Sequence, residues 1–348
     1  MRKIFENNPE FDGHKLVSTF YEKNIGLKGY IAIHNTTLGP AVGGTRFWIY
    51  KNEKDALSDV LRLSKSMTYK CALAGVPFGG GKAVIIANKH TKKNKKFLEL
   101  YASKINLLNG MFFTGEDVGL TMDDIKILVK HSKYVIGGPK NSGDPSPWAA
   151  LGVYYSILAS VECIYSSRSL YNKKIAVKGL GKVGGGLIKY LYKSGADIYV
   201  ADIDESRIKY IKKKYPKIHV VSADRIHKQK VDVYAPCALG KEFTKKTINE
   251  LQCKIICGAA NNQLGTKEDG IRLFKKGILY IPDYLANSGG LINVVSELEK
   301  DGYNRKKVSK KVKGIYDTTK KIINTSIKTN RPTSEVADSL AKTYFEKY

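Results

Sequence analysis

The feature that most constrains the fold is a glycine-rich turn with the sequence Gly179-Leu180-Gly181-Lys182-Val183-Gly184. The apolar segment 174–178 predicts a strand before this turn, and the residues through Tyr192 predict a helix after it. In such a unit the first glycine permits the tight turn, the second lets a pyrophosphate approach the backbone, and the third lets helix and strand pack closely. The phosphates lie at the helix N-terminus. The spacing therefore predicts a dinucleotide-binding site.

A carboxylate stands where a site of this kind uses one. Asp202 follows the next predicted strand, 197–201, and comes 18 residues after Gly184. A carboxylate at this place hydrogen-bonds the adenosine ribose hydroxyls and repels a 2′-phosphate, which favours NAD over NADP. Arg207 lies nearby and leaves NADP open. The alternative interpretation is an ordinary glycine turn followed by a solvated aspartate.

The second half of the chain alternates predicted strands and helices. A helix is expected over 204–214, and further strands are expected near 218–221, 231–235, 254–257 and 278–281. Repeated units of one strand and one helix predict a parallel, doubly wound sheet. The fold class is therefore α/β, with this sheet forming a Rossmann-type dinucleotide-binding domain.

The length of 348 residues favours two domains, because a single core rarely grows this large. We expect an N-terminal α/β domain at 1–140, the Rossmann-type domain at 141–330, and a cleft between them. The stretch 137–147 is rich in Gly, Pro, Ser and Asp and is the expected linker. A Lys-rich helix over about 304–326 and the final segment 331–348 are expected to pack back toward the first domain.

The first third of the chain contains a lysine in an unusual setting. A strand is predicted at 29–34 and an amphipathic helix at 54–69. A glycine-rich segment then ends in Gly79-Gly80-Gly81-Lys82 and leads into the apolar strand 83–86. The spacing of a Walker phosphate loop is absent. A desolvated lysine at Lys82, with Lys70 nearby in sequence, can act as a base near neutrality. Alone, an ordinary surface lysine is the simpler interpretation.

An acidic segment, Gly115-Glu116-Asp117-Val118-Gly119, follows the apolar residues 111–113. A carboxylate at the end of a strand is well placed for proton transfer. The alternative is that it caps the helix that is predicted to begin near Met122.

The composition excludes several classes of protein. Lys+Arg number 59 against 32 Asp+Glu, which gives a formal charge of +27, but only nine of the basic residues are Arg. Because specific nucleic-acid readers favour Arg for its bidentate fork, we expect a basic enzyme surface and no nucleic-acid partner. A nucleic-acid-associated protein that uses the charge of +27 is the alternative. No uninterrupted run of about 18 apolar residues occurs, which argues against a membrane span. The N-terminus lacks an apolar signal region, so a cytoplasmic location is expected.

The cysteines and histidines indicate no metal or nucleophile chemistry. The five cysteines are odd in number and form no CxxC pair, so we expect reduced thiols in the core. The six histidines are scattered singly along the sequence, and no metal site is expected.

Seven segments together resemble the leucine/phenylalanine/valine dehydrogenase branch of the glutamate dehydrogenase superfamily. They occur in the order seen in those enzymes: Gly43-Gly44-Thr45-Arg46, Met67-Thr-Tyr-Lys70, Gly79-Gly-Gly-Lys82, Gly115-Glu-Asp117, Ala235-Pro-Cys-Ala-Leu239, Gly258-Ala-Ala-Asn-Asn262 and Asn287-Ser-Gly-Gly-Leu-Ile-Asn293. The resemblance covers residues 10 to 300. It favours functional roles for Lys70, Lys82 and Asp117 over the interpretations as a surface lysine or a helix cap.

The resemblance implies reversible NAD-dependent conversion of an L-amino acid and water to a 2-oxo acid and ammonium. In the family, the lysine matching Lys70 binds the substrate carboxylate. The lysine matching Lys82 helps to activate water, and the aspartate matching Asp117 shuttles the proton of the substrate amine. All three residue types are retained, so an active enzyme is expected rather than an inactive NAD-binding regulatory homologue. The domain 1–140 then carries substrate binding, catalysis and oligomerisation, and a homo-oligomer is expected.

The resemblance also assigns the walls of the site. The backbone at Gly43 and Gly44 is expected to line the substrate site, and Asn262 is expected near the carboxylate or the nicotinamide amide. The residues expected beside the nicotinamide ribose are Ala235, Pro236, Cys237 and Asn261. Cys237 matches a cofactor-wall position, so it is assigned no chemistry.

The pocket residues implied by the resemblance are apolar, which disfavours glutamate as the substrate. They are Val42, Gly115, Leu291 and Val294. Phenylalanine-selective members carry the Gly and Leu seen here at positions 115 and 291, whereas aliphatic-selective members carry Ala and Val. The resemblance therefore favours phenylalanine or another bulky apolar amino acid, with leucine or valine as the alternative.

Overall fold

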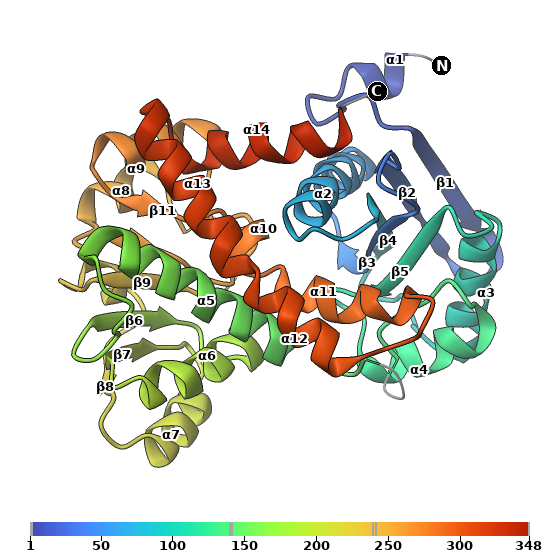
Figure 1. The fold of residues 1–348 in the computed structure, drawn as a ribbon. Coiled ribbons are helices and arrows are strands. Elements are labelled where there is room, and N and C mark those ends of the chain that lie inside the picture. The colour runs from blue at the N-terminus through green and yellow to red at the C-terminus, as the bar shows by residue number, and fades with distance from the viewer. Residues whose placement is uncertain (1–2, 139–141, 239, 241, 347–348) are drawn as a thin grey trace. The chain divides into compact units, whose positions relative to one another are not determined.

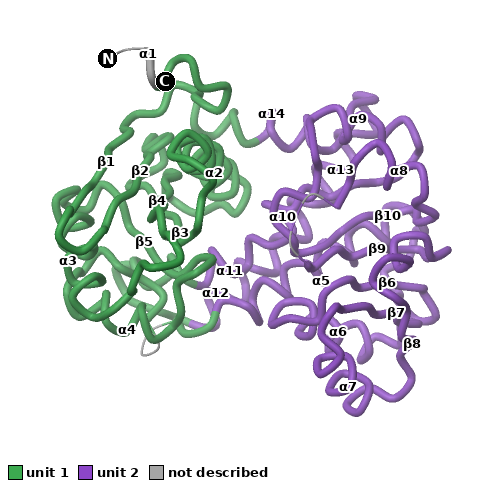
Figure 2. Tube along the Cα trace, turned by 180° about the vertical axis from the view of Figure 1, so that it is seen from behind, with its two compact units in different colours: residues 1–144, 294–304, 341–348 green, residues 145–293, 305–340 purple. Residues whose placement is uncertain are grey.

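Two β-sheets, one in each half of the chain, organise the structure, a computed structural model that describes residues 3–138, 142–238, 240 and 242–346. The chain divides into two compact units, shown in two colours in Figure 2. The first comprises residues 1–144, 294–304 and 341–348, and the second comprises 145–293 and 305–340. The domain boundary expected between 140 and 141 lies outside the described residues. The domain limits given above stay predictions.

The first unit is built on a five-stranded sheet with the order β1-β2-β4-β3-β5. Its strands are β1 (Leu16–Glu22), β2 (Leu27–Asn35), β3 (Ala41–Ile49), β4 (Gly79–Ala87) and β5 (Phe112–Glu116). Strand β2 is antiparallel to β1 and β4, whereas β3 runs parallel to β4 and β5. The strand predicted at 83–86 in fact begins at Gly79, so the glycines lie within β4 and not in a loop before it.

Helices cover both faces of this sheet (Figure 1). The helix α2 (Glu53–Leu73) packs on one face, where Val60 and Leu61 join Val84 in one apolar cluster. On the other face, Phe97 of α3 (Lys95–Asn106) and Ile125 of α4 (Met122–His131) join Ile85. The period of two along β4 therefore sends alternate residues to α2 and to the α3–α4 layer. The short elements of this unit are α1 (Lys3–Glu6) and η1 (Lys23–Ile25).

The second unit contains a six-stranded sheet in which every neighbouring pair is parallel. Its strands are β6 (Lys174–Lys178), β7 (Asp197–Ala201), β8 (His219–Val220), β9 (Val233–Pro236), β10 (Ile255–Ile256) and β11 (Leu279–Tyr280). The spatial order β8-β7-β6-β9-β10-β11 is that of a Rossmann fold, and it reverses direction between β6 and β9. The predicted doubly wound sheet is confirmed.

The helices of the second unit flank this sheet (Figure 1). They are α5 (Ser146–Tyr165), α6 (Lys182–Lys193), α7 (Glu205–Lys214), η2 (Ile226–Lys228), α8 (Lys245–Glu250), α9 (Lys267–Lys275) and α10 (Asp283–Ala286). By length and hydropathy α5 could cross a membrane, although it contains no uninterrupted run of about 18 apolar residues. Just over half of α5 is buried inside the protein, and it packs against α6 and α13 (Ile315–Thr329), as expected of a core helix.

The C-terminal region differs from the expected single helix over 304–326. It contains α11 (Gly289–Val295), η3 (Ser296–Leu298), α12 (Arg305–Lys313), α13 and α14 (Thr333–Phe345). Gly314 separates α12 from α13, and glycine is a poor helix former. The last residues of α14 belong to the first unit, where the Phe345 ring contacts His34 and Tyr69.

Candidate active site

A buried ion pair joins the two residues predicted to handle protons. The Lys82 Nζ atom, on β4, lies 2.8 Å from Oδ2 of Asp117, the residue directly after β5. Their side chains are 8% and 17% exposed. The interpretation of Lys82 as a surface lysine is therefore wrong. Asp117 does not cap α4 either, because Thr121 and Asp124 form that helix's capping box.

Arg46 provides a second cation at the same carboxylate. Its Nε atom lies 3.2 Å from Asp117 Oδ2. Burial raises the pKa of Asp117, but the charges of Lys82 and Arg46 outweigh burial and hold the pKa below its usual range. The structure thus places an ionised carboxylate beside an ammonium group in a largely dry environment, an arrangement suited to proton transfer.

The glycines around this pair are required by close packing. A Cβ atom on Gly43 would lie 1.9 Å from the Gly81 carbonyl oxygen, and one on Gly44 would lie 2.8 Å from the Asp117 Cβ. A side chain at position 44 would therefore displace Asp117. A Cβ on Gly115 would lie 2.9 Å from the carbonyl oxygen of Ile136. Alanine at position 115 would thus push on backbone, and not only fill a pocket.

The other predicted substrate residues lie on several elements. Lys70 is half-buried near the end of α2, the helix that packs against β4. Val294 lies in the first unit, about 3.6 Å from where a Cβ of Gly137 would stand. Leu291 on α11 and Asn262 lie in the second unit. Asn262 adopts the left-handed backbone conformation with φ of 56°, which Asn tolerates better than most residues.

The predicted dinucleotide turn has the geometry that its glycines suggested. Gly179 has φ of 96°, and a Cβ on it would meet the backbone of Cys237 and Ala238. A Cβ on Gly184 would lie 1.9 Å from the Gly179 carbonyl oxygen. By contrast, among the described residues a Cβ on Gly181 would meet only the tip of Arg207, at 3.8 Å, so these residues leave the approach to this backbone open. Gly181 is also the N-cap of α6 and offers no side-chain acceptor to it.

Asp202 stands at the end of β7 and is tied to the turn. Its Oδ2 atom accepts a hydrogen bond from Leu180 N at 2.5 Å, and its Oδ1 atom accepts one from Asp204 N at 2.9 Å. Arg207 lies 3.9 Å from Asp202 and 3.1 Å from Asp204. The interpretation of Asp202 as a solvated aspartate is wrong, because its side chain is 5% exposed.

The segment after β9 meets the turn where the sheet reverses its strand order. Ala235 and Pro236 are buried at the end of β9, beside β6. Burial raises the pKa of the neighbouring Cys237 thiol to about 11, consistent with an inert side chain. On the other side, Asn287 donates a hydrogen bond of 2.7 Å to the side chain of Asn261. The structure therefore gathers the glycine turn and the ends of β7 and β9 at one edge of the sheet.

Comparison with known proteins identifies the family. The sequence profile described as "Glu/Leu/Phe/Val dehydrogenase, dimerisation domain" matches residues 17–134, and the profile "Glutamate/Leucine/Phenylalanine/Valine dehydrogenase" matches residues 198–341. The chain belongs to the Glu/Leu/Phe/Val dehydrogenase family. It is 44% identical to an L-tryptophan dehydrogenase of Nostoc punctiforme over 97% of this chain and 95% of that protein.

Two further relatives cover the chain almost completely. Leucine dehydrogenase of Bacillus subtilis (strain 168) is 41% identical over 99% of this chain and 94% of its own length. Phenylalanine dehydrogenase of Thermoactinomyces intermedius is 41% identical over 100% of this chain and 95% of its own. The crystal structure of L-tryptophan dehydrogenase from Nostoc punctiforme superposes with a TM-score of 0.85, at 43% identity, and covers 99% of this chain and 98% of that one. The chain is thus an amino acid dehydrogenase of the Leu/Phe/Trp/Val type.

Several groups around the site of this dehydrogenase were not assigned from sequence. Arg46 also contacts Asp59 on α2, with 2.8 Å between Nη1 and Oδ2. On the opposite face of the sheet, the hydroxyl of Thr45 contacts those of Thr114, at 2.7 Å, and Tyr101. The period of two along β3 predicts that residues 45 and 46 face opposite ways, but not which partners they meet.

Two histidines that are separate in sequence lie together in the structure. The rings of His14 and His34 are 4.9 Å apart between centroids. His34 lies where β2 bulges against β4, and its Nδ1 atom is 2.8 Å from the Thr68 hydroxyl. Burial and the neighbouring His14 lower the pKa of His34 to about 4. No spacing pattern in the sequence predicts this pair.

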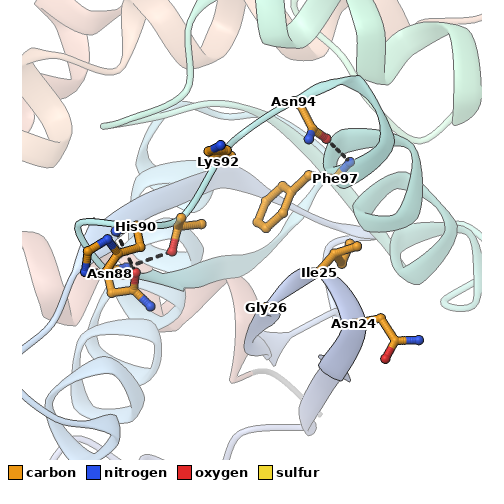
Figure 3. A pocket seen from close by; sticks show the side chains of 9 residues that line it. Asn24, Ile25, Gly26, Asn88, His90, Lys92, Asn94 and Phe97 are labelled. Carbon is orange, nitrogen blue, oxygen red and sulfur yellow. Dashed lines mark hydrogen bonds between the residues drawn. The ribbon is translucent and has the colours of Figure 1, made fainter.

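A surface pocket of about 360 Å³ lies elsewhere in the first unit (Figure 3). Its lining comes from η1, the loop after β4 and the start of α3: Asn24, Ile25, Gly26, Asn88, His90, Thr91, Lys92, Asn94 and Phe97. None of these residues belongs to the predicted site. The side chains of Asn88, Thr91 and Asn94 accept hydrogen bonds from nearby backbone N–H groups, as Asn94 does from Phe97 N at 3.0 Å. We assign this pocket no function.

Proposed function

We propose that this dehydrogenase catalyses the reversible, NAD-dependent oxidative deamination of an apolar L-amino acid to its 2-oxo acid and ammonium, with preference for phenylalanine or another bulky side chain. The observation that carries the proposal is the ion pair of 2.8 Å between Lys82 and Asp117, two largely buried groups of the first unit. An inactive regulatory homologue would have no need to keep such a pair intact.

In the proposed reaction Lys70 pairs with the substrate carboxylate and so fixes the α-carbon. Asp117, held ionised, takes up the proton that the substrate amine must lose before the carbon–nitrogen double bond forms. NAD, when bound, accepts the hydride from the α-carbon. Lys82 then orients the water that attacks the resulting iminium carbon. Asp117 returns its proton to the nitrogen as the carbon–nitrogen bond breaks, and of the two protons lost by the water one leaves with the ammonium ion and the other passes to solvent. Both groups act on neighbouring atoms of one substrate, which their direct contact permits.

The residues of the second unit fit a dinucleotide. The open backbone at Gly181 and the N-terminus of α6 offer N–H groups to a pyrophosphate, alongside Leu180, Lys182 and Val183. Asp202 is proposed to face the adenosine ribose. Because Arg207 already lies near two carboxylates, its charge is largely compensated, which supports NAD over NADP. Ala235, Pro236, Cys237 and Asn261 are proposed to flank the nicotinamide ribose.

The preference for a bulky substrate is supported by the residues proposed to form the pocket. Val42, Gly115, Leu291 and Val294 offer no charge to a substrate side chain such as that of glutamate. The relatives named above are dehydrogenases of tryptophan, leucine and phenylalanine, so the family accommodates both aromatic and branched side chains. We further propose a homo-oligomer in the cytoplasm, with no nucleic-acid or membrane partner.

The test is NADH formation at mildly alkaline pH with phenylalanine, tryptophan, leucine, valine and glutamate in parallel, each with NAD and with NADP. The proposal predicts turnover with the apolar amino acids, the highest kcat/KM with an aromatic one, and weak or no activity with glutamate or NADP. A higher kcat/KM for leucine or valine would replace the preference but keep the reaction. No turnover with any amino acid, despite measurable NADH binding, would contradict the reaction itself.

Two variants sharpen the preference. Leu291→Val and Gly115→Ala exchange the residues for those of aliphatic-selective members and are expected to shift the phenylalanine-to-leucine ratio of kcat/KM by about tenfold, since one methylene in a pocket contributes about 1–3 kcal/mol. Gly115→Ala should also lower stability, because its Cβ would meet the Ile136 carbonyl oxygen at 2.9 Å. An unchanged ratio in both folded variants would contradict these residues as determinants.

A further inference from the structure

We propose that Arg46 is a positioning residue that orients Asp117 for proton transfer, and that Asp59 of α2 fixes Arg46 for this task. The inference rests on the proposed role of Asp117. It assigns functions to two residues outside the groups that touch the substrate, and it is carried by a chain of alternating charges on the α2 face of the first sheet.

The inner end of the chain is the shared oxygen of Asp117. Lys82 Nζ and Arg46 Nε both contact Oδ2, at 2.8 and 3.2 Å, which leaves Oδ1 outside these two ion pairs. Two cations arriving from neighbouring strands at one oxygen restrict the rotation of the carboxylate. The register of β3 with β5 creates this approach, because Thr45 pairs with Glu116, so Arg46 lies beside the residue that follows β5. Gly44 leaves the space that the Asp117 side chain occupies.

The outer end of the chain fixes Arg46. Its Nη1 atom lies 2.8 Å from Asp59 Oδ2, which also accepts a hydrogen bond of 2.8 Å from the Tyr50 hydroxyl. The other oxygen of Asp59 contacts Arg62, one turn further along α2. The side chains of Arg46 and Asp59 are 16% and 15% exposed. Water therefore screens this pair weakly, and its geometry is held more firmly than that of a surface ion pair.

The chemistry of arginine explains why this residue type stands here. Its planar guanidinium group presents N–H donors in different directions, so Nε can serve Asp117 while Nη1 serves Asp59. A lysine carries the same charge on a single nitrogen and has no fixed fork. Arg46→Lys therefore separates the loss of orientation from the loss of charge.

The arrangement also predicts a pH effect. Among the described residues, Lys82 on β4 and Arg46 on β3 are in ion-pair contact with Asp117, Glu116 precedes it in the chain, and Asp59 and Tyr50 lie behind Arg46. The two cations hold the pKa of Asp117 below its usual range. Without the Arg46 charge the Asp117 carboxyl takes up a proton at higher pH, so the acidic limb of the kcat/KM profile should shift to higher pH.

The experiment compares Arg46→Met, Arg46→Lys and Asp59→Asn with wild type in oxidative deamination. We expect kcat to fall about 100-fold in Arg46→Met and about tenfold in the other two variants, with KM for the amino acid changed less than about threefold. The reason is that proton transfer by a well-positioned side chain accelerates a reaction by about 10²–10⁴-fold. In Arg46→Met the acidic limb of the kcat/KM profile should shift by about one pH unit to higher pH. The matched control is Arg168→Met, which removes an exposed arginine paired with Glu162 at 3.2 Å in the second unit and should leave kcat unchanged.

The outcomes separate this inference from the proposed function. Full activity of Asp117→Asn would contradict the proposed site. Inactive Asp117→Asn together with a wild-type kcat and pH profile in folded Arg46→Met would overturn the positioning role alone. Wild-type kcat in Asp59→Asn would overturn the role of Asp59. Urea unfolding shows whether each variant is folded. If Arg46→Met does not fold, the charge-conserving variant Arg46→Lys tests the positioning role instead. A raised KM at unchanged kcat in Arg46→Lys, or no change in either constant, contradicts that role.

Discussion

The two glycine-rich segments of this dehydrogenase look alike in sequence but meet different physical demands. In Gly79-Gly80-Gly81 the glycines lie inside the central strand β4, where Cβ atoms would meet Asn35, Thr68 and Phe112. In the turn that starts at Gly179, one glycine takes a positive φ, whereas a Cβ on Gly181 would meet no described atom closer than the tip of Arg207, at 3.8 Å. The first segment is glycine because protein crowds it, and we propose that the second is partly glycine because a ligand must approach.

The difference shows what each segment does for the site. Crowding at Gly80 brings α2 against β4, so that Thr68 packs directly on the strand that carries Lys82 two residues later. Openness at Gly181 exposes backbone N–H groups at the start of α6. We therefore expect substitutions in the first segment to act on stability and catalysis together, and substitution of Gly181 to act on the cofactor alone.

The largest effect on stability is expected for Gly80→Ala. Its Cβ would lie 2.0 Å from the backbone nitrogen of Thr68, so strand and helix would have to separate. Overpacking of this kind costs about 3 kcal/mol in the free energy of unfolding, measured by urea denaturation. The control is Gly185→Ala within α6, where the nearest atom would lie at 3.4 Å and alanine is the better helix former. Equal stability of the two variants would contradict the crowding at β4.

Gly181→Ala should leave the urea midpoint close to wild type but weaken NADH binding. The added methyl group would occupy the approach to the phosphates, and a loss of about tenfold in affinity corresponds to about 1.4 kcal/mol. Fluorescence titration of NADH measures it. Gly184→Ala differs, because its Cβ would lie 1.9 Å from the Gly179 carbonyl oxygen, and it should lose stability as well. Unchanged NADH affinity in Gly181→Ala would show that the approach of a ligand is not the reason for glycine at this position.

The smallest effect is expected for His34, which contacts Thr68, the residue that packs against Gly80. The pKa of His34 is lowered to about 4, against an unfolded value of about 6.5. Because the pKa of His34 is lower in the folded protein, the unfolded chain binds a proton at this residue more readily. The contribution of His34 to the free energy of unfolding is therefore fully present above pH 6.5 and is lost as the pH falls toward 4. Stability should drop by about 1 kcal/mol between pH 7 and 5.5 from this group.

The measurement is the urea midpoint against pH for wild type and His34→Gln. The variant keeps a polar side chain but cannot be protonated in this range, so its profile should be flatter. Identical profiles would show that His34 does not sense pH and that the contact with Thr68 depends on other groups.

Local patterns in the sequence were sufficient for the parallel sheet of the second unit, but not for its C-terminal helices or for the sheet of the first unit. The turn at Gly179 and the flanking strands 174–178 and 197–201 follow from runs of apolar residues and from glycine spacing, which are properties of short segments. The start of β4 was missed, because glycine carries no strand preference of its own. Its extended conformation is set by pairing with β2 and β3, whose partner residues are distant in sequence.

The same reason explains which site residues could be predicted. Lys82 and Asp117 were assigned from the family resemblance, but their contact depends on the strand order of the sheet. The contacts of Arg46 with Asp59 and Asp117 span 13 and 71 residues, and no spacing rule links them. His14 and His34 come together only through the bulge in β2 and the packing of α2.

The central claim, that the pair of Lys82 and Asp117 performs the chemistry, is tested most directly by NADH formation from L-phenylalanine and NAD in wild type and in Lys82→Ala. We expect steady turnover by wild type and a fall in kcat of at least about 100-fold in a folded variant that still binds NADH. A folded Lys82→Ala enzyme with wild-type kcat would show that this pair does not perform the chemistry.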